Sequence, residues 1–127
     1  MIVVDASTVV AALLHRGLAR EQLAREQLHA PHLLDTEVAH ALRRRVAAGQ
    51  LTADAGWTAL HTLGRLGMTR HAGFPVAARV WELRDNVSAY DATYVALAEQ
   101  LGCPLVTTDA RLSKAPGLRC PVTLLPN

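Results

Sequence analysis

The sequence predicts an α/β fold of three layers, in which helices cover both faces of a small, mostly parallel β-sheet. Two short apolar runs, at Ile2–Val4 and Pro104–Thr108, are rich in β-branched residues, as expected of strands that are buried on both faces. Several segments with apolar residues at helical spacing lie between these runs. Strands that alternate with helices are typical of a parallel sheet covered by helices.

The first half of the chain begins with the strand Ile2–Val4. We expect the next helix to begin near Val9, with Ser7 or Thr8 as its cap. A five-residue repeat in Leu18–Leu28 fits a short surface helix. The other elements expected in this half are a connector that begins at Pro31, a helix over Glu37–Ala48 capped by Asp35 or Thr36 and ended by Gly49, and a helix over Ala53–Leu66 capped by Thr52, with Trp57, Leu60 and Leu63 at helical spacing.

The second half contains the sharpest local signals. Ser88 and Gly102 bracket a helix over Ala89–Leu101, because serine favours the start of a helix and glycine its end. The other expected elements are a short strand at Met68–His71, a helix over Val76–Leu83 opened by Pro75, the strand at Pro104–Thr108, a helical turn at Arg111–Lys114 and a strand at Val122–Leu125.

Length and composition narrow the class of protein. We expect residues 1–127 to form a single domain, since this length can bury one core but not two. No segment has the length and apolar character of a transmembrane helix or a signal peptide, so a cytoplasmic protein without membrane association is expected. The spacing of Cys103 and Cys120 favours reduced thiols over a disulfide.

The charge pattern is only mildly basic, with a net charge of +2 and a pI of about 8.8. This excludes a strongly basic nucleic-acid binder. Twelve of the thirteen basic residues are arginine, which suits phosphate recognition, although a GC-rich genome produces the same bias. The chain has only five aromatic residues, which argues against an extended platform for base stacking.

Four of the eleven acidic residues occupy related positions in the predicted fold. Asp5 and Asp109 each follow an apolar strand, while Glu37 and Asp91 each fall in the first turn of a helix. Strand carboxyl ends and the following helix starts lie on one edge of a parallel sheet. Four carboxylates on one edge would repel one another unless cations neutralise them, and oxygen ligands in that number select Mg²⁺ or Mn²⁺.

Each acid alone also has a purely structural interpretation. Asp91 completes a capping box with Ser88, and Glu37 complements a helix dipole. Asp109 can cap its own helical turn. Asp5 is the hardest to explain structurally, because an acid at the end of a buried run costs free energy unless it is paired. Glu21, Glu26 and Glu99 are expected on exposed helix faces.

The blocks IVVDASTVV, LLDTEVAHALRR, NVSAYDATYVALAEQLG and PLVTTDARL closely resemble the PIN domain, and more narrowly the VapC-type ribonuclease toxins of toxin–antitoxin pairs. The resemblance implies a PIN-like three-layer α/β/α fold and a metal-dependent endoribonuclease. It places Asp5, Glu37, Asp91 and Asp109 on the four acidic positions of the PIN site, as catalytic residues and metal ligands. Ser7 and Thr107 match the small hydroxyl positions beside the first and last acids.

The same resemblance implies Mg²⁺ or Mn²⁺ as cofactor, RNA as substrate and 5′-phosphate and 3′-hydroxyl product ends. It also implies a VapB-like antitoxin, and a homodimer or a toxin–antitoxin hetero-oligomer. Two other functions share the fold: a PIN-like module that binds RNA or protein without cleavage, and a nuclease of RNA processing. Retention of all four acids favours an enzyme over a binding module.

Two basic clusters have weaker interpretations. Arg43, Arg44 and Arg45 either carry an RNA backbone toward the acids or form a solvated helix face. His29 and His32 are expected to be a surface pair rather than zinc ligands, because no further ligand completes the set.

Overall fold

The computed structural model describes residues 1–126 and contains a five-stranded sheet in the order β3-β2-β1-β4-β5. Each neighbouring pair of strands in this sheet is parallel. The strands are β1 (Ile2–Val4), β2 (Leu28–Pro31), β3 (Met68–His71), β4 (Leu105–Thr107) and β5 (Val122–Leu124). The sheet is therefore the small parallel one that the alternation of elements predicted.

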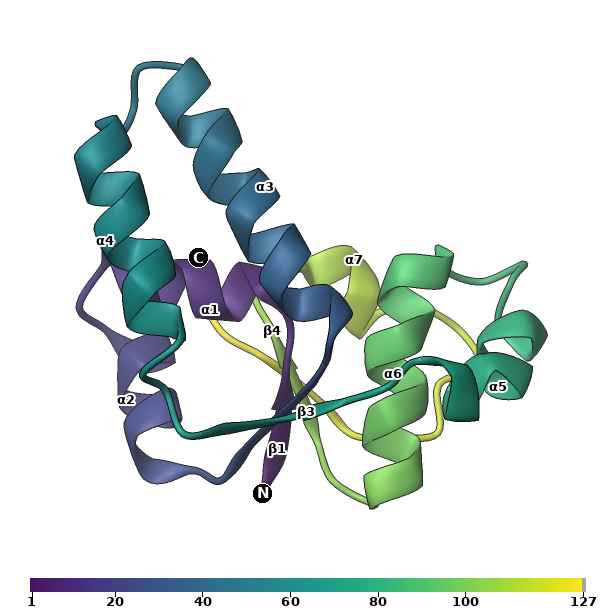
Figure 1. The fold of residues 1–127 in the computed structure, drawn as a ribbon. Coiled ribbons are helices and arrows are strands. Elements are labelled where there is room, and N and C mark those ends of the chain that lie inside the picture. Colours follow the sequence, from purple (N-terminus) through teal and green to yellow (C-terminus); the bar gives the residue numbers. More distant parts are fainter. Residues whose placement is uncertain (127) are drawn as a thin grey trace.

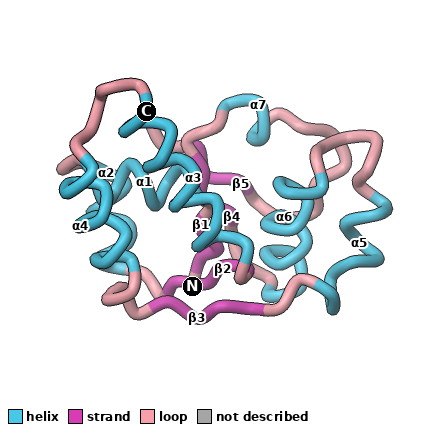
Figure 2. Tube along the Cα trace, turned by 45° about the horizontal axis from the view of Figure 1, so that its top comes forward, coloured by secondary structure: helices cyan, strands magenta, loops and turns pink. Residues whose placement is uncertain are grey.

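Helices cover both faces of the sheet. The helices are α1 (Ala6–Leu14), α2 (Leu18–Arg25), α3 (Leu33–Ala47), α4 (Ala53–Leu63), α5 (Ala77–Glu82), α6 (Ala89–Leu101) and α7 (Ala110–Ser113), and a 3₁₀ turn spans Phe74–Val76. Figures 1 and 2 show α1 to α4 grouped on one side of the strands and α5 and α6 on the other. The expected three-layer α/β/α architecture is confirmed.

The core lies where the central strands meet these two helical layers. Val3, Val4, Leu105 and Val106 of β1 and β4 are almost completely buried, as their β-branched runs predicted. The middle of α6, from Tyr94 to Ala98, is buried as well, which explains why its sequence is apolar all round there. Among residues 1–126, no helix is long and apolar enough to cross a membrane. Cys103 and Cys120 are free thiols, as their spacing predicted.

The boundaries of α6 and the cap of α4 agree with the sequence. Ser88 accepts a hydrogen bond from the backbone N–H of Asp91, and Gly102 ends the helix in the left-handed conformation that glycine adopts without strain. Thr52 caps α4 through the backbone N–H of Ala55, as expected. Local capping chemistry therefore fixes these helix ends.

The expected start of α1 was wrong by three residues. The helix begins at Ala6 rather than near Val9, and its cap is Asp5 rather than Ser7 or Thr8. The Asp5 carboxylate accepts a hydrogen bond from the backbone N–H of Thr8 at 3.0 Å, which is the contact that an N-cap makes.

The expected start of α3 was also wrong. The helix begins at Leu33, so that Glu37 lies in its second turn and neither Asp35 nor Thr36 is the cap. Asp35 instead accepts two hydrogen bonds from the guanidinium of Arg70 on β3, at 2.7 and 2.9 Å. This long-range ion pair occupies the side chain that would otherwise cap a later helix start.

Strand β2 was missed because its four residues lack the β-branched, alternating signature of a strand. It includes His29 and ends at Pro31, where a missing backbone donor is tolerated. His29 is buried and bonded to His71 of β3 with 2.9 Å between Nδ1 and Nε2, so the expected surface pair of His29 and His32 was wrong. Burial lowers the pKa of His29 below its ordinary value.

Glu99 is not on an exposed face of α6, contrary to expectation. Its side chain is 11% exposed and accepts from the Arg79 guanidinium of α5 at 2.7 Å and from the backbone N–H of Arg119 at 2.7 Å. Burial alone would raise the pKa of Glu99, but these hydrogen bonds hold it below its ordinary value. Trp57, Leu60 and Leu63 were placed at helical spacing in α4, and of these Leu63 is buried while Trp57 is 65% exposed.

We expect Glu99→Ala to lower the free energy of unfolding by about 2 kcal/mol at pH 7, because it leaves the Arg79 guanidinium without its main partner. Urea titration measures this change, and Glu21→Ala on the exposed face of α2 is the matched control. The folded-state pKa of Glu99 is depressed, so the difference should shrink as the pH falls below 4.5. A loss no greater than that of Glu21→Ala would show that the ion pair contributes nothing.

Candidate active site

Asp5 stands at the carboxyl end of the central strand β1, with both carboxylate oxygens engaged. Its Oδ1 accepts from the Ser7 hydroxyl at 2.8 Å and from the Thr8 backbone N–H. Its Oδ2 accepts from the Thr107 hydroxyl. Asp5 is only 7% exposed, so these donors compensate for the burial of a charge and also fix the orientation of the carboxylate.

Two hydroxyl groups link the ends of β1 and β4. The Thr107 hydroxyl donates to Asp5 and accepts from the backbone N–H of Asp109 at 3.0 Å. The Ser7 hydroxyl donates to Asp5 and accepts from the backbone N–H of Thr108 at 3.2 Å. Ser7 and Thr107 therefore set the relative positions of the first and last acids of the predicted site.

Glu37 reaches the same region from the second turn of α3. Its Oε1 accepts from the hydroxyl of Tyr94 at 2.6 Å, and Tyr94 is only 1% exposed within α6. Burial raises the pKa of Glu37, the Tyr94 hydrogen bond opposes this, and the negative charges of Asp91 and Asp5 raise it further. Burial and the Glu37 contact also raise the pKa of Tyr94, so this hydroxyl remains a donor.

Tyr94 is a site residue that the sequence did not single out. The only local signal is its position three residues after Asp91, which puts the two side chains on one face of α6. Its partner, Glu37, lies 57 residues earlier in the chain, so the contact could be known only from the fold.

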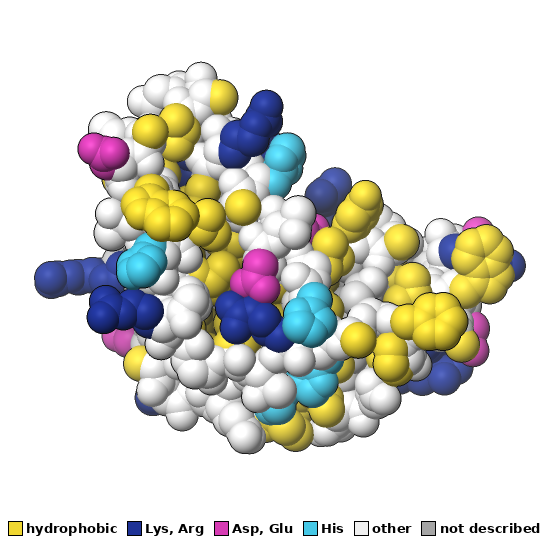
Figure 3. Space-filling view, in the orientation of Figure 1, with side chains coloured by type: hydrophobic (Ala, Val, Ile, Leu, Met, Phe, Trp, Pro, Cys, Tyr) yellow, Lys and Arg dark blue, Asp and Glu magenta, His cyan; other side chains and the backbone are white. Residues whose placement is uncertain are grey.

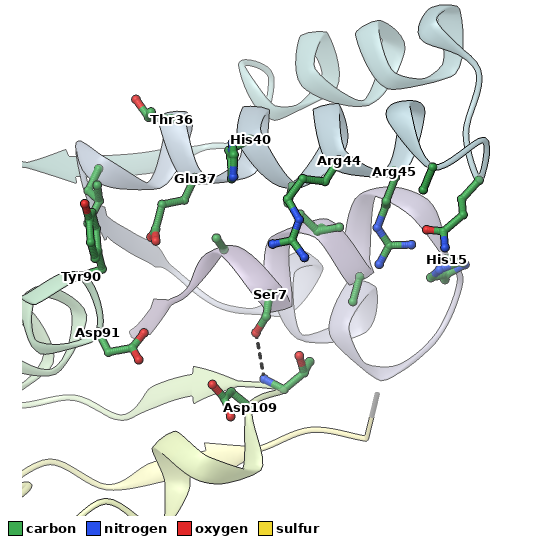
Figure 4. Close-up of a pocket in the computed structure, with 18 of the residues that line it drawn as sticks. Ser7, His15, Thr36, Glu37, His40, Arg44, Arg45, Tyr90, Asp91 and Asp109 are labelled. Carbon is green, nitrogen blue, oxygen red and sulfur yellow. Dashed lines mark hydrogen bonds between the residues drawn. The ribbon is translucent and has the colours of Figure 1, made fainter. Parts of the chain in front are cut away.

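Asp91 and Asp109 complete the acidic cluster. The Asp91 backbone bonds to Ser88, but its carboxyl group turns toward the groove that Glu37 and Asp109 also face (Figure 4). Burial raises the pKa of Asp91, and the charges of Asp109 and Asp5 raise it further. Asp109 caps α7 by accepting a hydrogen bond from the backbone N–H of Arg111 at 2.9 Å, so it also has the capping role that the sequence allowed.

The four acids suit a hard divalent cation by their chemistry. Burial is the main cause of the raised pKa values of Glu37 and Asp91, and the neighbouring carboxyl groups raise them further; a cation would relieve that repulsion. Within residues 1–126, no three His, Cys, Asp or Glu side chains are drawn together closely enough to enclose an ion. Carboxylate oxygens nevertheless suit Mg²⁺, because this ion is often held by only one or two carboxylates and keeps several of its waters.

Three of the four acids line one end of a groove of about 1100 Å³ between α1, α3 and the starts of α6 and α7. Glu37, Asp91 and Asp109 lie along its wall, while the buried Asp5 does not line it. Arg44 and Arg45 point into the other part of the groove, near His15, as Figure 4 shows. The groove therefore has an acidic end and a basic end.

The three arginines of α3 separate in the structure. Among residues 1–126, the groove lining includes Arg44 and Arg45 but not Arg43, which is exposed. The periodicity of a helix explains the difference, because successive residues point about 100° apart. His40, one turn before Arg44, is a further lining residue that the sequence did not indicate.

Comparison with known proteins agrees with this geometry. The PIN domain matches residues 2–118. The chain belongs to the PIN-domain family. Ribonuclease VapC9 of Mycobacterium tuberculosis is 52% identical over 126 residues, which cover 99% of each chain. Ribonuclease VapC1 of the same organism is 43% identical over 132 residues, covering 97% of this chain and 96% of the relative. The expected VapC-type resemblance is confirmed.

Solved structures share the PIN fold. PAE2754 from Pyrobaculum aerophilum aligns with a TM-score of 0.72 and 26% identity over 88% of this chain and 83% of its own. VapC20 of Mycobacterium tuberculosis, described as a toxin that cleaves the sarcin–ricin loop, aligns with a TM-score of 0.68 over 89% of this chain and 93% of its own. At 18% identity, the VapC20 match supports the fold alone.

We expect Asp91→Asn to stabilise the protein by roughly 0.5 kcal/mol at pH 7 in the presence of a chelator, because it removes a partly buried charge that neighbouring acids also repel. The folded-state pKa of Asp91 is raised, so its ionisation costs stability at high pH and the gain should vanish as the pH falls below 3.8.

Urea unfolding at several pH values measures this gain. Asp54→Asn, which removes an exposed acid from the first turn of α4, is the matched control and should not stabilise the protein. An Asp91→Asn variant less stable than wild type at pH 7 would mean that the carboxylate is favourably paired rather than repelled.

Proposed function

We propose that this protein is a VapC-type endoribonuclease toxin whose single domain, residues 1–127, hydrolyses RNA with Mg²⁺ or Mn²⁺ held by Asp5, Glu37, Asp91 and Asp109. The observation that supports the proposal is that Glu37, Asp91 and Asp109, from three separate elements, line one end of an open groove. Asp5 lies buried beside them, joined to the backbone of Asp109 through the Thr107 hydroxyl. The ribonuclease names of relatives that match nearly the whole chain support the same activity.

Each residue of the proposed site has a separate role in the reaction. Bound Mg²⁺ or Mn²⁺ would supply an acidified water as nucleophile and offset the charge that develops on the phosphoryl oxygens. Asp5, held by three donors, is the rigid ligand, and Thr107 keeps Asp109 at a fixed position beside it. Tyr94 orients Glu37 by donating to one oxygen, which leaves the other free to face the groove.

The basic end of the groove suits the RNA backbone. Arg44 and Arg45 carry fixed positive charges toward the path that leads to the acids. No histidine, serine or cysteine is needed as nucleophile, and hydrolysis with a metal-activated water would leave 5′-phosphate and 3′-hydroxyl ends. The acids would then carry the chemistry while the arginines supply affinity.

A non-cleaving PIN module is a weaker alternative. A scaffold that only binds RNA or protein has no need to keep four mutually repelling carboxyl groups in one place, since they cost stability. A nuclease of RNA processing would share the site, but the VapC names of several relatives favour a toxin.

The toxin assignment extends to partners. We expect a VapB-like antitoxin to cover the groove and to place a basic side chain among the acids, where it would neutralise the charge as a cation does. A homodimer or a toxin–antitoxin hetero-oligomer stays a prediction, and the cytoplasm is the expected location because the substrate is RNA.

Asp5→Asn is expected to reduce RNA cleavage by about 100-fold or more while leaving the fold intact, because the ligand charge is lost but the amide oxygen can still cap α1. Mapping of 5′ ends across total RNA, with Mg²⁺ or Mn²⁺ added, measures the cleavage. Asp85→Asn, which removes an exposed acid outside the groove lining, is the control. Cleavage by Asp5→Asn at the wild-type rate would show that the site is misassigned.

Replacing both Arg44 and Arg45 with glutamine is expected to weaken RNA binding and to reduce the slope of log affinity against log salt by about 0.7 for each lost phosphate contact. The measurement is fluorescence anisotropy with a single-stranded RNA, on an Asp5→Asn background that does not cut it. Arg43→Gln, next to them on the same helix but outside the groove lining, should leave the slope unchanged. Equal changes of the slope at all three positions would mean that the three arginines form a solvated helix face and not an RNA-binding site.

A further inference from the structure

A second, smaller pocket adjoins the acidic end of the groove. Its volume is about 430 Å³, within the range of roughly 300–1,000 Å³ that small-molecule sites occupy. Its lining residues are Pro31, Leu33, Gly73, Ala89, Tyr90 and Thr93, none of which is charged. An uncharged lining does not suit a phosphate, so this pocket differs in chemistry from the groove beside it.

Tyr90 and Leu33 line both cavities, so the pocket is continuous with the groove. Tyr90 directly precedes Asp91 on α6, and the residue is 61% exposed, so it is not part of the core. Figure 4 shows the ring at the end of the groove where Glu37 and Asp91 lie. A phosphodiester held at Asp91 would therefore bring a neighbouring nucleotide next to this aromatic ring.

We propose that this pocket is a nucleobase subsite, in which an unpaired base next to the scissile phosphate stacks on Tyr90. The inference rests on the proposed RNA cleavage and adds to it a specific base contact, which requires an unpaired base beside the scissile phosphate. In an A-form duplex the base faces are stacked on their neighbours, so a base can reach an aromatic ring only where it is unpaired.

The pocket recognises a base by shape and stacking rather than by hydrogen bonds from its walls. The Thr93 hydroxyl donates to the backbone carbonyl of Ala89 at 2.8 Å and is thus directed to its own helix. The other lining side chains apart from Tyr90 are apolar or absent. Stacking tolerates every base because each has a π-face, so this subsite should favour unpaired bases without strong selection among them.

Other exposed aromatic side chains provide a natural comparison. Figure 3 shows hydrophobic side chains gathered over α5 and the 3₁₀ turn before it. Trp81 of α5 is 68% exposed, its ring carries the Arg84 guanidinium at 4.9 Å, and it lines neither the groove nor the pocket. If exposed aromatic side chains contributed to RNA binding in general, replacing Trp81 would weaken binding as well. If Tyr90 forms a specific base subsite, replacing Trp81 should have no such effect.

The test uses a short single-stranded RNA that contains one mapped cleavage site. We expect Tyr90→Ala to lower kcat/KM by about tenfold, mainly through KM, because one stacked base is lost. Tyr90→Phe should retain wild-type kinetics, since the ring supplies the stacking, and Trp81→Ala should stay within about twofold of wild type. Thermal melts of each variant confirm that the exposed positions leave the fold unchanged.

An RNA that lacks one base identifies the contact. Abasic substitution on one side of the scissile phosphate should reduce wild-type kcat/KM by a similar factor, and Tyr90→Ala should then cause no further loss. An equal penalty from Tyr90→Ala on intact RNA and on both flanking abasic RNAs would overturn the subsite. A changed oligomeric mass in Tyr90→Ala with unchanged cleavage would also overturn it and would assign the ring to a protein interface.

Failure of the wild type to cut RNA would contradict the proposed function but not by itself the subsite. In that event, anisotropy with the same RNAs decides: weaker binding by Tyr90→Ala on intact RNA but not on one abasic RNA supports the subsite. Equal binding of every RNA by wild type and Tyr90→Ala would overturn it.

Discussion

The hydrogen-bond cluster around Asp5 is the constraint on which the site depends. β1 and β4 are neighbours at the centre of the sheet, and the chain leaves them toward opposite helical layers, which opens a crevice at their carboxyl ends. The Thr107 hydroxyl spans this crevice by donating to Asp5 and accepting from the backbone of Asp109. Ser7 makes a parallel link to Thr108, so the two strand ends behave as one rigid unit.

This rigidity allows the protein to keep repelling charges together. Burial and neighbouring acids raise the pKa values of Glu37 and Asp91, which means that the apo site is held at a cost in stability. Tyr94 offsets part of that cost by donating to Glu37 from within the core. A site that is destabilised without a cation and relieved by one is well prepared to bind either a metal ion or the basic side chain of an inhibitor.

The groove holds the acids proposed for catalysis at one end and the arginines proposed for RNA binding at the other. Acids gather at the sheet edge because strand ends and helix starts converge there, whereas Arg44 and Arg45 lie farther along α3. On the far side of the acids, Tyr90 and the uncharged pocket offer an apolar contact in place of a charged one. A single-stranded RNA laid through this path would meet positive charge, then the acids, then an aromatic ring.

Local signals in the sequence determined the strands β1 and β4, the whole of α6 and the caps at Thr52 and Ser88. Each of these depends on residues close together in the chain, such as a β-branched run or a serine before a helix. The start of α3, the strand β2 and the burial of Glu99 were decided by the tertiary structure instead. They follow from partners far along the chain, because Asp35 pairs with Arg70, β2 lies between two parallel strands, and Glu99 meets Arg79. The Tyr94–Glu37 contact has the same origin, because only packing brings these two side chains together.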